Sequence, residues 1–144
     1  DIIDLMGKIR NLDQLFSWIS VLAGKIRERT SVLRANNAQR LLDQAVSFIQ
    51  LNYSDPDLTI DDVCDSLGIS ASYLSQLFKK HKESTFVKFL TSVRMEKAVE
   101  RLVSSGDRIV EIAAACGYQD VYYFSHTFKK QVGMSPKKYR EENT

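Results

Sequence analysis

With 144 residues and a hydrophobic content of 44%, the chain is long enough for one or two small domains and too apolar for a disordered segment. Its 2 prolines and 6 glycines favour helices with short connections, and no apolar run approaches the ~20 residues that cross a bilayer. Residues 1–67 carry a net charge of −3 (7 basic, 10 acidic) and residues 68–144 carry +5 (13 and 8), which indicates a polyanionic partner for the second half.

The N-terminal segment, residues 1–37, carries a heptad pattern. Seven of its nine positions are apolar: Leu5, Lys8, Leu12, Leu15, Ile19, Leu22, Ile26, Arg29 and Leu33. This pattern is typical of a two-stranded coiled coil, so we predict a linker helix that forms a homodimer through residues 5–33. The predicted contact residues are Leu12, Leu15, Ile19, Leu22, Ile26 and Leu33. The alternative is a helix packed on an upstream domain or on its own domain, because Phe16, Trp18 and Ala23 widen the apolar surface.

Residues 59–82 are predicted to form two helices joined by a glycine turn. Thr59 is a good N-cap, with Asp62 three residues later as an acidic variant of the capping box. Gly68 can take the left-handed conformation that ends a helix, and Ser70 can cap the next one. The apolar positions fall at helical spacing: Ile60, Val63, Cys64, Leu67, then Tyr73, Leu74, Leu77 and Phe78.

Residues 85–104 are predicted to form one linker helix. Its apolar side consists of Phe86, Phe89, Leu90, Val93, Ala98 and Leu102. Twenty residues of helix span about 30 Å. Adjacent major-groove windows on one face of B-DNA lie about 34 Å apart. A rigid helix of this length would therefore hold the helices on either side of it at a separation close to one duplex turn.

Residues 107–131 repeat the first pair of helices. Val63 and Gly68 correspond to Ile112 and Gly117, and "YLSQLFKK" from Tyr73 corresponds to "YFSHTFKK" from Tyr123. A small residue followed by a glycine at a helix crossing is typical of a helix-turn-helix, and Pro136 suits the first turn of a last short helix. The predicted fold class is all-α: tandem helix-turn-helix motifs (about 59–82 and 107–131) joined by a long linker helix and preceded by an extended N-terminal helix.

The second motif resembles the signature of the AraC/XylS family of bacterial transcription regulators. The match runs from Ile109 to Arg140, "IVEIAAACGYQDVYYFSHTFKKQVGMSPKKYR", and "RMEKAVERL" from Arg94 resembles the family's linker helix. The resemblance covers residues 38–144. Two positions depart from the family pattern: His126 replaces the usual arginine, and Glu83 replaces the glycine expected after the first motif. The loss of that glycine puts the local turn in doubt.

Membership of this family implies a seven-helix domain that binds double-stranded DNA through both motifs. It also implies a cytoplasmic protein with RNA polymerase as a partner and with a sensory or phosphoacceptor domain upstream. Because the chain opens at Asp1 without a methionine, we expect further residues before it in the whole protein.

The predicted DNA-reading residues lie opposite the apolar face of each second helix. The base-contact candidates are Ala71, Ser72, Ser75, Gln76, Val121, Tyr122, Ser125 and His126. Gln76 is the strongest, because its amide can pair bidentately with adenine. The phosphate-contact candidates are Lys79, Lys80, Lys129, Lys130, Lys137 and Lys138. The alternative for each is a solvated surface residue, or for the lysines at helix ends a favourable dipole interaction. Tyr73, Tyr118, Tyr123 and Tyr139 are expected to pack.

The sequence offers little for catalysis or metal binding. Cys64 and Cys116 are isolated from each other and from His81 and His126, so no metal site, cofactor or activated cysteine nucleophile is expected. Two reduced, buried thiols fit a cytosolic protein. The main rival to a DNA-binding regulator is a helical protein-interaction adaptor, against which the lysine pairs and the repeat spacing argue.

Overall fold

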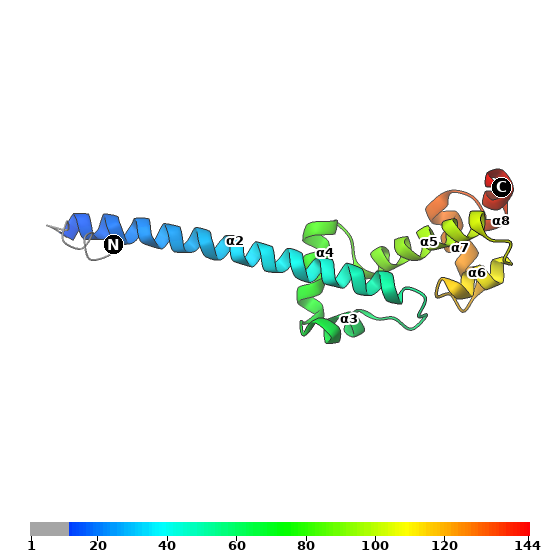
Figure 1. Ribbon diagram of the computed structural model, residues 1–144, viewed down its shortest axis with the longest axis horizontal. Helices are drawn as coiled ribbons and strands as arrows, with labels where there is room; N and C mark the ends of the chain where they lie inside the picture. Colours follow the sequence, from blue (N-terminus) through cyan, green and yellow to red (C-terminus); the bar gives the residue numbers. More distant parts are fainter. Residues whose placement is uncertain (1–11) are drawn as a thin grey trace. The chain divides into compact units, whose positions relative to one another are not determined.

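The computed structural model describes residues 12–144, and within them the chain forms seven α-helices and no strand (Figure 1). The helices are α2 (Leu12–Asn52), α3 (Ile60–Leu67), α4 (Ala71–Lys82), α5 (Phe86–Ser104), α6 (Ile109–Ala115), α7 (Val121–Val132) and α8 (Pro136–Asn143). The predicted all-α fold with tandem helix-turn-helix motifs is confirmed. Two heptad positions, Leu5 and Lys8, lie outside the described residues.

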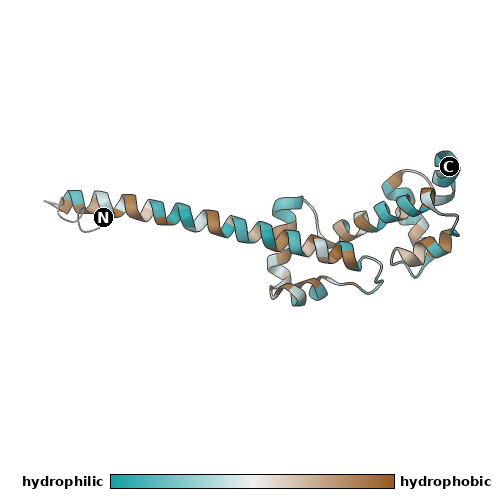
Figure 2. Cartoon of the chain, viewed as in Figure 1, coloured by the Kyte–Doolittle hydropathy of each residue, from teal (hydrophilic) through white to brown (hydrophobic). Residues whose placement is uncertain are grey.

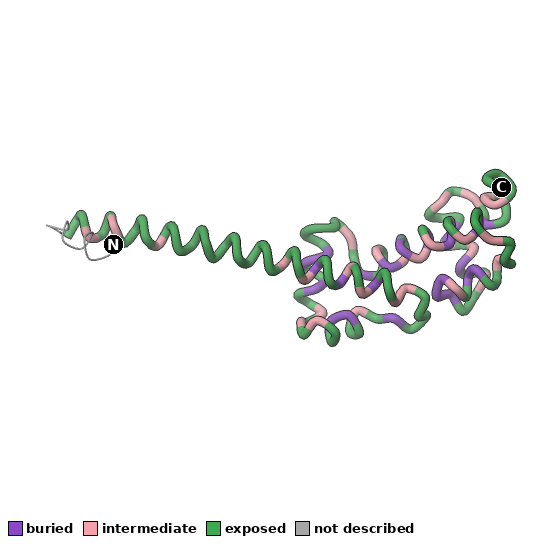
Figure 3. Tube along the Cα trace, viewed as in Figure 1, coloured by how far each residue is buried: buried purple, intermediate pink, exposed green. Residues whose placement is uncertain are grey.

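The chain divides into two units at Arg40, which lies within α2. Between Leu12 and Arg40 no described residue is buried, whereas Leu42, Ala45 and Ile49 in the last part of the same helix are buried (Figure 3). Hydrophobic residues recur between hydrophilic ones along the exposed part (Figure 2). Several apolar side chains in the described residues before Arg40 are therefore exposed, among them Leu12, Ile19, Ile26 and Leu33.

The first helix-turn-helix motif consists of α3 and α4. Thr59 caps α3, and its backbone N–H and hydroxyl donate to the Asp62 carboxylate at 2.7 and 2.6 Å, which confirms the capping box. Gly68 ends α3 in the left-handed region (φ 66°), and Ser70 caps α4 by accepting from the backbone N–H of Tyr73. These local interactions set the turn between the two helices.

The second motif, α6 and α7, uses different caps. The Glu111 carboxylate accepts from the backbone N–H of Arg108 at 2.8 Å and from its guanidinium Nη2 at 2.8 Å. Asp120 caps α7 by accepting from the backbone N–H groups of Tyr122 and Tyr123 at 2.7 and 3.0 Å. Residues 116–120 separate the helices, a longer connection than residues 68–70 in the first motif.

The last helix, α8, begins at Pro136, as predicted. This proline stands in the first turn, and the Ser135 hydroxyl accepts from the backbone N–H of Lys138.

α5 joins the two motifs and is buried along two successive stretches. Its first stretch buries Phe86, Leu90 and Val93. Its second stretch belongs to a core cluster of Met95, Ala98, Leu102, Ile112, Ala113, Cys116, Tyr118, Phe124 and Phe128. The remaining buried side chains of residues 41–85 come from α2, α3, α4 and the loop between α2 and α3: Leu42, Ala45, Ile49, Leu58, Val63, Cys64, Leu74, Leu77 and Phe78. One uninterrupted helix therefore runs from the first motif to the second.

Candidate nucleic-acid interface

The outer face of α4 is polar because its apolar side chains take the inner one. Leu74, Leu77 and Phe78 are buried, at the three- and four-residue spacing of one helix face. The base-contact candidates Ser72, Ser75 and Gln76 are all exposed, and Ala71 is half-buried. Within residues 12–144 the Gln76 amide forms no hydrogen bond, so both its donor and its acceptor remain open to a ligand.

The outer face of α7 is more aromatic than that of α4. Phe124 and Phe128 are buried, while Tyr122 is 85% exposed and His126 is exposed. Two other base-contact candidates are less available: Ser125 is half-buried, and Val121 packs against the second-motif core. The structure therefore leaves Tyr122 and His126 as the most accessible candidates of the second motif.

The six candidate phosphate-binding lysines fall into two groups. Lys79 and Lys80 lie in the last turn of α4, Lys129 and Lys130 lie in the last turn of α7, and within the described part of the chain none of the four forms a hydrogen bond or ion pair. Lys137 and Lys138 instead lie 3.9 and 3.5 Å from the carboxylates of Glu141 and Glu142. Those pairs are exposed and weak, but they reduce the local positive charge. The lysines of the recognition helices are thus the better candidates.

The assignment of the four tyrosines to packing is correct for two of them. Tyr118 is buried, and Tyr139 is half-buried with its ring 5.8 Å from that of Phe128. The prediction is wrong for Tyr123, which is 63% exposed, and for Tyr73, which is also exposed. Each of these tyrosines immediately precedes a buried residue, Leu74 or Phe124. One residue along a helix is a rotation of about 100°, so the tyrosine side chain points away from the buried face. The centre of the Tyr123 ring lies 6.0 Å from that of the buried Tyr118 ring.

The sequence pattern was not interpreted as placing Asp120 at the N-cap of α7. Its carboxylate stands at the N-terminus of α7, where the corresponding cap of α4 is the neutral Ser70. An acidic residue followed by the first apolar turn is a recognisable N-cap signal, so this cap was detectable from the sequence. The consequence is electrostatic: a negative charge offsets the positive end of the α7 dipole beside the exposed Tyr122.

The described residues contain neither a cluster that could hold a metal nor a helix that could span a membrane. Among residues 12–144 no three or more His, Cys, Asp or Glu side chains lie together where they would hold a metal ion. None of the helices described here is long and apolar enough to span a membrane. Both cysteines are buried, and burial raises the pKa of the Cys64 and Cys116 thiols. A raised pKa opposes the thiolate that a nucleophilic cysteine needs.

Comparison with known proteins places this arrangement in a family. A family model described as a helix-turn-helix domain matches residues 63–142. The raffinose operon transcriptional regulatory protein RafR of Pediococcus pentosaceus is 44% identical over 97 residues, which cover 67% of this chain and 35% of that protein. The melibiose operon regulatory protein of Escherichia coli K12 is 32% identical over 140 residues, which cover 96% and 46%. The chain thus spans less than half the length of these curated relatives.

A solved structure gives the same result. The C-terminal domain of AraT, a response regulator from Geobacillus stearothermophilus, superposes with a TM-score of 0.69 at 41% identity, covering 71% of this chain and 84% of that one. Both the helix order and the two motifs built from it were expected from the sequence. The chain belongs to the AraC/XylS family of DNA-binding transcription regulators.

Proposed function

We propose that this chain is the DNA-binding output part of a larger sensory or response-regulator protein. In this proposal α4 and α7 enter two successive major grooves on one face of the duplex. The observation that carries the proposal is the continuity of α5, which runs unbroken from Phe86 to Ser104 between the two motifs. The family relationship supports RNA polymerase as a further partner of the whole protein.

The length of α5 fits a two-groove arrangement. Its 19 residues span about 28 Å at 1.5 Å per residue. Successive grooves on one face are about 34 Å apart, and the side chains and the width of α4 and α7 extend the reach. Both recognition helices also present exposed polar or aromatic side chains and end in lysine pairs. Base contacts and phosphate contacts are therefore available from each motif.

We assign unequal roles to the two recognition helices. Gln76 is the proposed base reader of α4, with Ser72 and Ser75 beside it. Tyr122 and His126 are the proposed readers of α7, where Tyr122 can contact a thymine methyl or bond a phosphate. Lys79, Lys80, Lys129 and Lys130 are proposed to hold phosphates on either side.

The test is selection of binding sites from random duplexes, followed by a change in spacing. We expect two short conserved blocks about 10 bp apart, and inserting about 5 bp between them should remove most of the specific affinity because one block turns to the opposite face. A selection that enriches no sequence would contradict DNA reading and favour the adaptor function. A single enriched block that is insensitive to the insertion would contradict two-groove reading.

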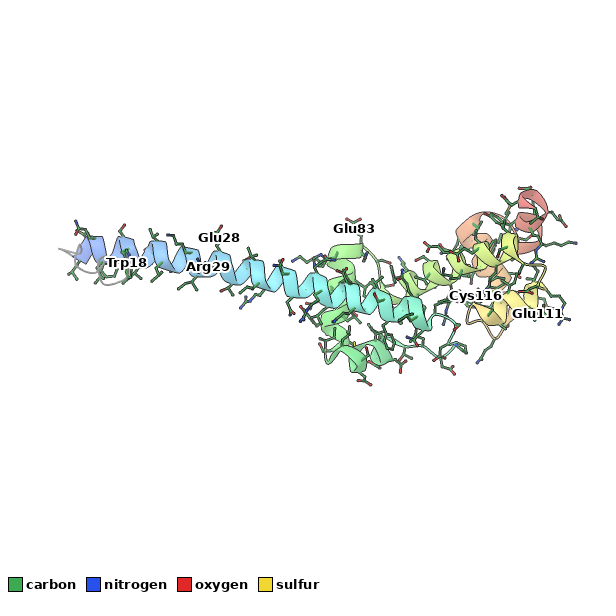
Figure 4. All side chains as sticks on the ribbon, viewed as in Figure 1. Trp18, Glu28, Arg29, Glu83, Glu111 and Cys116 are labelled. Carbon is green, nitrogen blue, oxygen red and sulfur yellow. The ribbon has the colours of Figure 1, made fainter. Side chains whose placement is uncertain are left out.

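We further propose that residues 12–33 pair with a second copy of the chain. Leu12, Ile19, Ile26 and Leu33 recur every seven residues, with Leu15 and Leu22 between them, and Ile at one heptad position with Leu at the other favours two parallel strands. Within the described part of α2 the side chains of Leu12, Ile19, Leu22, Ile26 and Leu33 are exposed. A second copy of this helix would cover them. Arg29 interrupts the apolar series (Figure 4).

The dimer is tested with Leu22→Lys, which puts a charge at the centre of the proposed seam. We expect the parent chain to sediment as a dimer and the variant as a monomer, with the helix-turn-helix motifs still folded by circular dichroism. A matched control is Ser20→Lys, which adds the same charge at an exposed position outside the seam and should leave the dimer intact. A monomeric parent, or a variant that stays dimeric, would contradict the seam.

A further inference from the structure

Arg94 occupies the point of α5 at which the buried surface changes from one motif to the other. Val93 is buried outside the second-motif core, whereas Met95 belongs to it. The Arg94 side chain itself reaches back to the loop that follows α2. Its Nε donates to the backbone carbonyl of Tyr53 at 2.8 Å, and its Nη2 donates to that of Asp55 at 2.6 Å.

The guanidinium also lies against the turn of the second motif. Its Cζ lies 5.4 Å from the centre of the buried Tyr118 ring, a cation–π arrangement. Gly117 is so close that a Cβ built on it would stand 2.9 Å from the Arg94 Nε and 2.6 Å from the Tyr53 carbonyl oxygen. Three segments therefore meet here: the loop after α2, the middle of α5 and the turn between α6 and α7. We call these interactions the Arg94 contact.

Beside the Arg94 contact, the space between the loop and α6 is not filled by apolar packing. A hollow of about 260 Å³ separates Pro56 of the loop from α6, with Val110 and Ala114 on its far wall. Arg94 is half-buried, and this burial lowers the pKa of its guanidinium.

We propose that Arg94 is a positioning residue that fixes the distance and angle between the two recognition helices. It does so by holding the loop before α3 against the turn before α7. Without Arg94, the loop would lose the two side-chain hydrogen bonds that hold it to the middle of α5. This inference rests on the proposed two-groove reading. Arg94 itself touches no base in that scheme.

The structure supplies a matched control in Arg140. Its Nε donates to the Leu102 carbonyl at 3.2 Å and its Nη2 to the Asp107 carbonyl at 2.7 Å, so the chemistry is that of Arg94. Leu102 lies in the second stretch of α5, Asp107 lies in the loop that follows α5, and Arg140 lies on α8, so this contact stays on the side of the second motif. Arg94→Lys and Arg140→Lys each keep the charge and lose the fork geometry. Arg94→Gln is a second variant, which removes the charge and keeps a single NH2 group as donor.

The first measurement uses the full chain and duplexes with the two selected blocks at altered spacing. We expect Arg94→Lys to lose about tenfold or more in affinity for the parent spacing, because uncoupled motifs lose effective concentration. It should also respond less than the parent chain to insertion or removal of 1 or 2 bp. Affinity for a duplex with one block scrambled should change by less than about twofold. Arg140→Lys should weaken binding while keeping the parent's spacing preference.

The second measurement needs no DNA, which separates this inference from the proposed function. Spin labels carried by encoded non-cysteine side chains at Gln76 and Gln131 report the distance between the recognition helices. We expect one narrow distance distribution for the parent and for Arg140→Lys, and a broad one for Arg94→Lys and Arg94→Gln. Narrow distributions for folded Arg94 variants, or equal broadening by Arg140→Lys, would overturn the proposal even if two-block DNA binding held. A parent with a narrow distribution but no spacing preference would instead overturn the two-groove reading.

Discussion

The two helix-turn-helix motifs turn at corresponding glycines, but only one of these glycines is enclosed. Gly68 and Gly117 both have positive φ, 66° and 83°. A Cβ on Gly68 would meet nothing within 4 Å, whereas a Cβ on Gly117 would stand 2.6 Å from the Tyr53 carbonyl oxygen. The repeat thus preserves the local conformation of the turn, and the second copy adds a long-range contact. A sequence repeat is evidence for equal turns and not for equal surroundings.

The largest expected effect comes from replacing the enclosed glycine. Gly68→Ala places an alanine in the left-handed conformation without steric overlap, which should lower the free energy of unfolding by about 1–2 kcal/mol. Gly117→Ala adds a steric overlap of the Cβ with a backbone carbonyl, which costs about 1–3 kcal/mol more. Urea unfolding of both variants measures the difference. Equal losses of unfolding free energy would contradict the distinction between the two turns.

Interactions between residues close together in the sequence were predicted, whereas interactions between distant residues were missed. The Thr59–Asp62 capping box, the Gly68 turn and the Ser70 cap involve residues within three or four positions of each other, and all were predicted. The Arg94 guanidinium contacts carbonyls 41 and 39 residues earlier, and no periodicity reports such a pairing. Tyr123 was mispredicted for a local reason: its residue type favours burial, but its side chain is one helical step away from the buried line of Phe124.

The ends of α4 and α7 give the next comparison. Gly133 ends α7 in the left-handed region, whereas Glu83 ends α4 at φ 49° and is the one non-glycine residue with positive φ among residues 12–144. The turn that the missing glycine put in doubt therefore forms with glutamate. The Glu83 side chain points outward from it (Figure 4).

Glu83→Gly should therefore stabilise the protein by about 1 kcal/mol, because glycine has no Cβ to strain. Gly133→Glu should destabilise it by a similar amount. Chemical denaturation of the two variants and the parent provides the measurement. Destabilisation by Glu83→Gly would mean that the glutamate side chain makes a contribution beyond its exposed surroundings.

A smaller effect is expected from the caps of the two recognition helices. Asparagine caps a helix about as well as aspartate, so Asp120→Asn should keep α7 folded while removing a negative charge near the proposed DNA surface. We expect affinity for all duplex sequences to rise alike, by about two- to fivefold at low salt. Ser70→Asp should lower affinity through α4 in the same uniform way, with Ser70→Asn as its control. A change confined to one base position would contradict a purely electrostatic effect.

The smallest expected effect concerns the capping carboxylates of α3 and α6, Asp62 and Glu111. Their pKa values should respond differently to salt. The pKa of Asp62 is lowered by the hydrogen bond from the Thr59 hydroxyl and then by that from the Thr59 backbone N–H. The pKa of Glu111 is lowered by the hydrogen bonds from the Arg108 side chain and then by that from its backbone N–H. The first carboxylate thus has neutral donors, and the second has a charged one.

In both cases the folded pKa lies below the unfolded one, so the unfolded chain binds more protons in the acidic range. The stabilising contribution is complete above the ordinary values of 3.8 for Asp62 and 4.5 for Glu111, and it is lost as the pH falls through the lowered folded values.

Salt separates the two carboxylates, because about 1 M salt screens the exposed Arg108–Glu111 ion pair far more than hydrogen bonds between neutral donors and a carboxylate. In an NMR titration of the side-chain carboxyl carbons, we expect added salt to move the pKa of Glu111 towards its ordinary value and to leave that of Asp62 low. Arg108→Gln should raise the pKa of Glu111 alone, and Thr59→Ala should raise that of Asp62 alone. If salt shifted both carboxyls equally, the two caps would share one electrostatic origin, and the first helices of the motifs would be alike in physics as well as in sequence position.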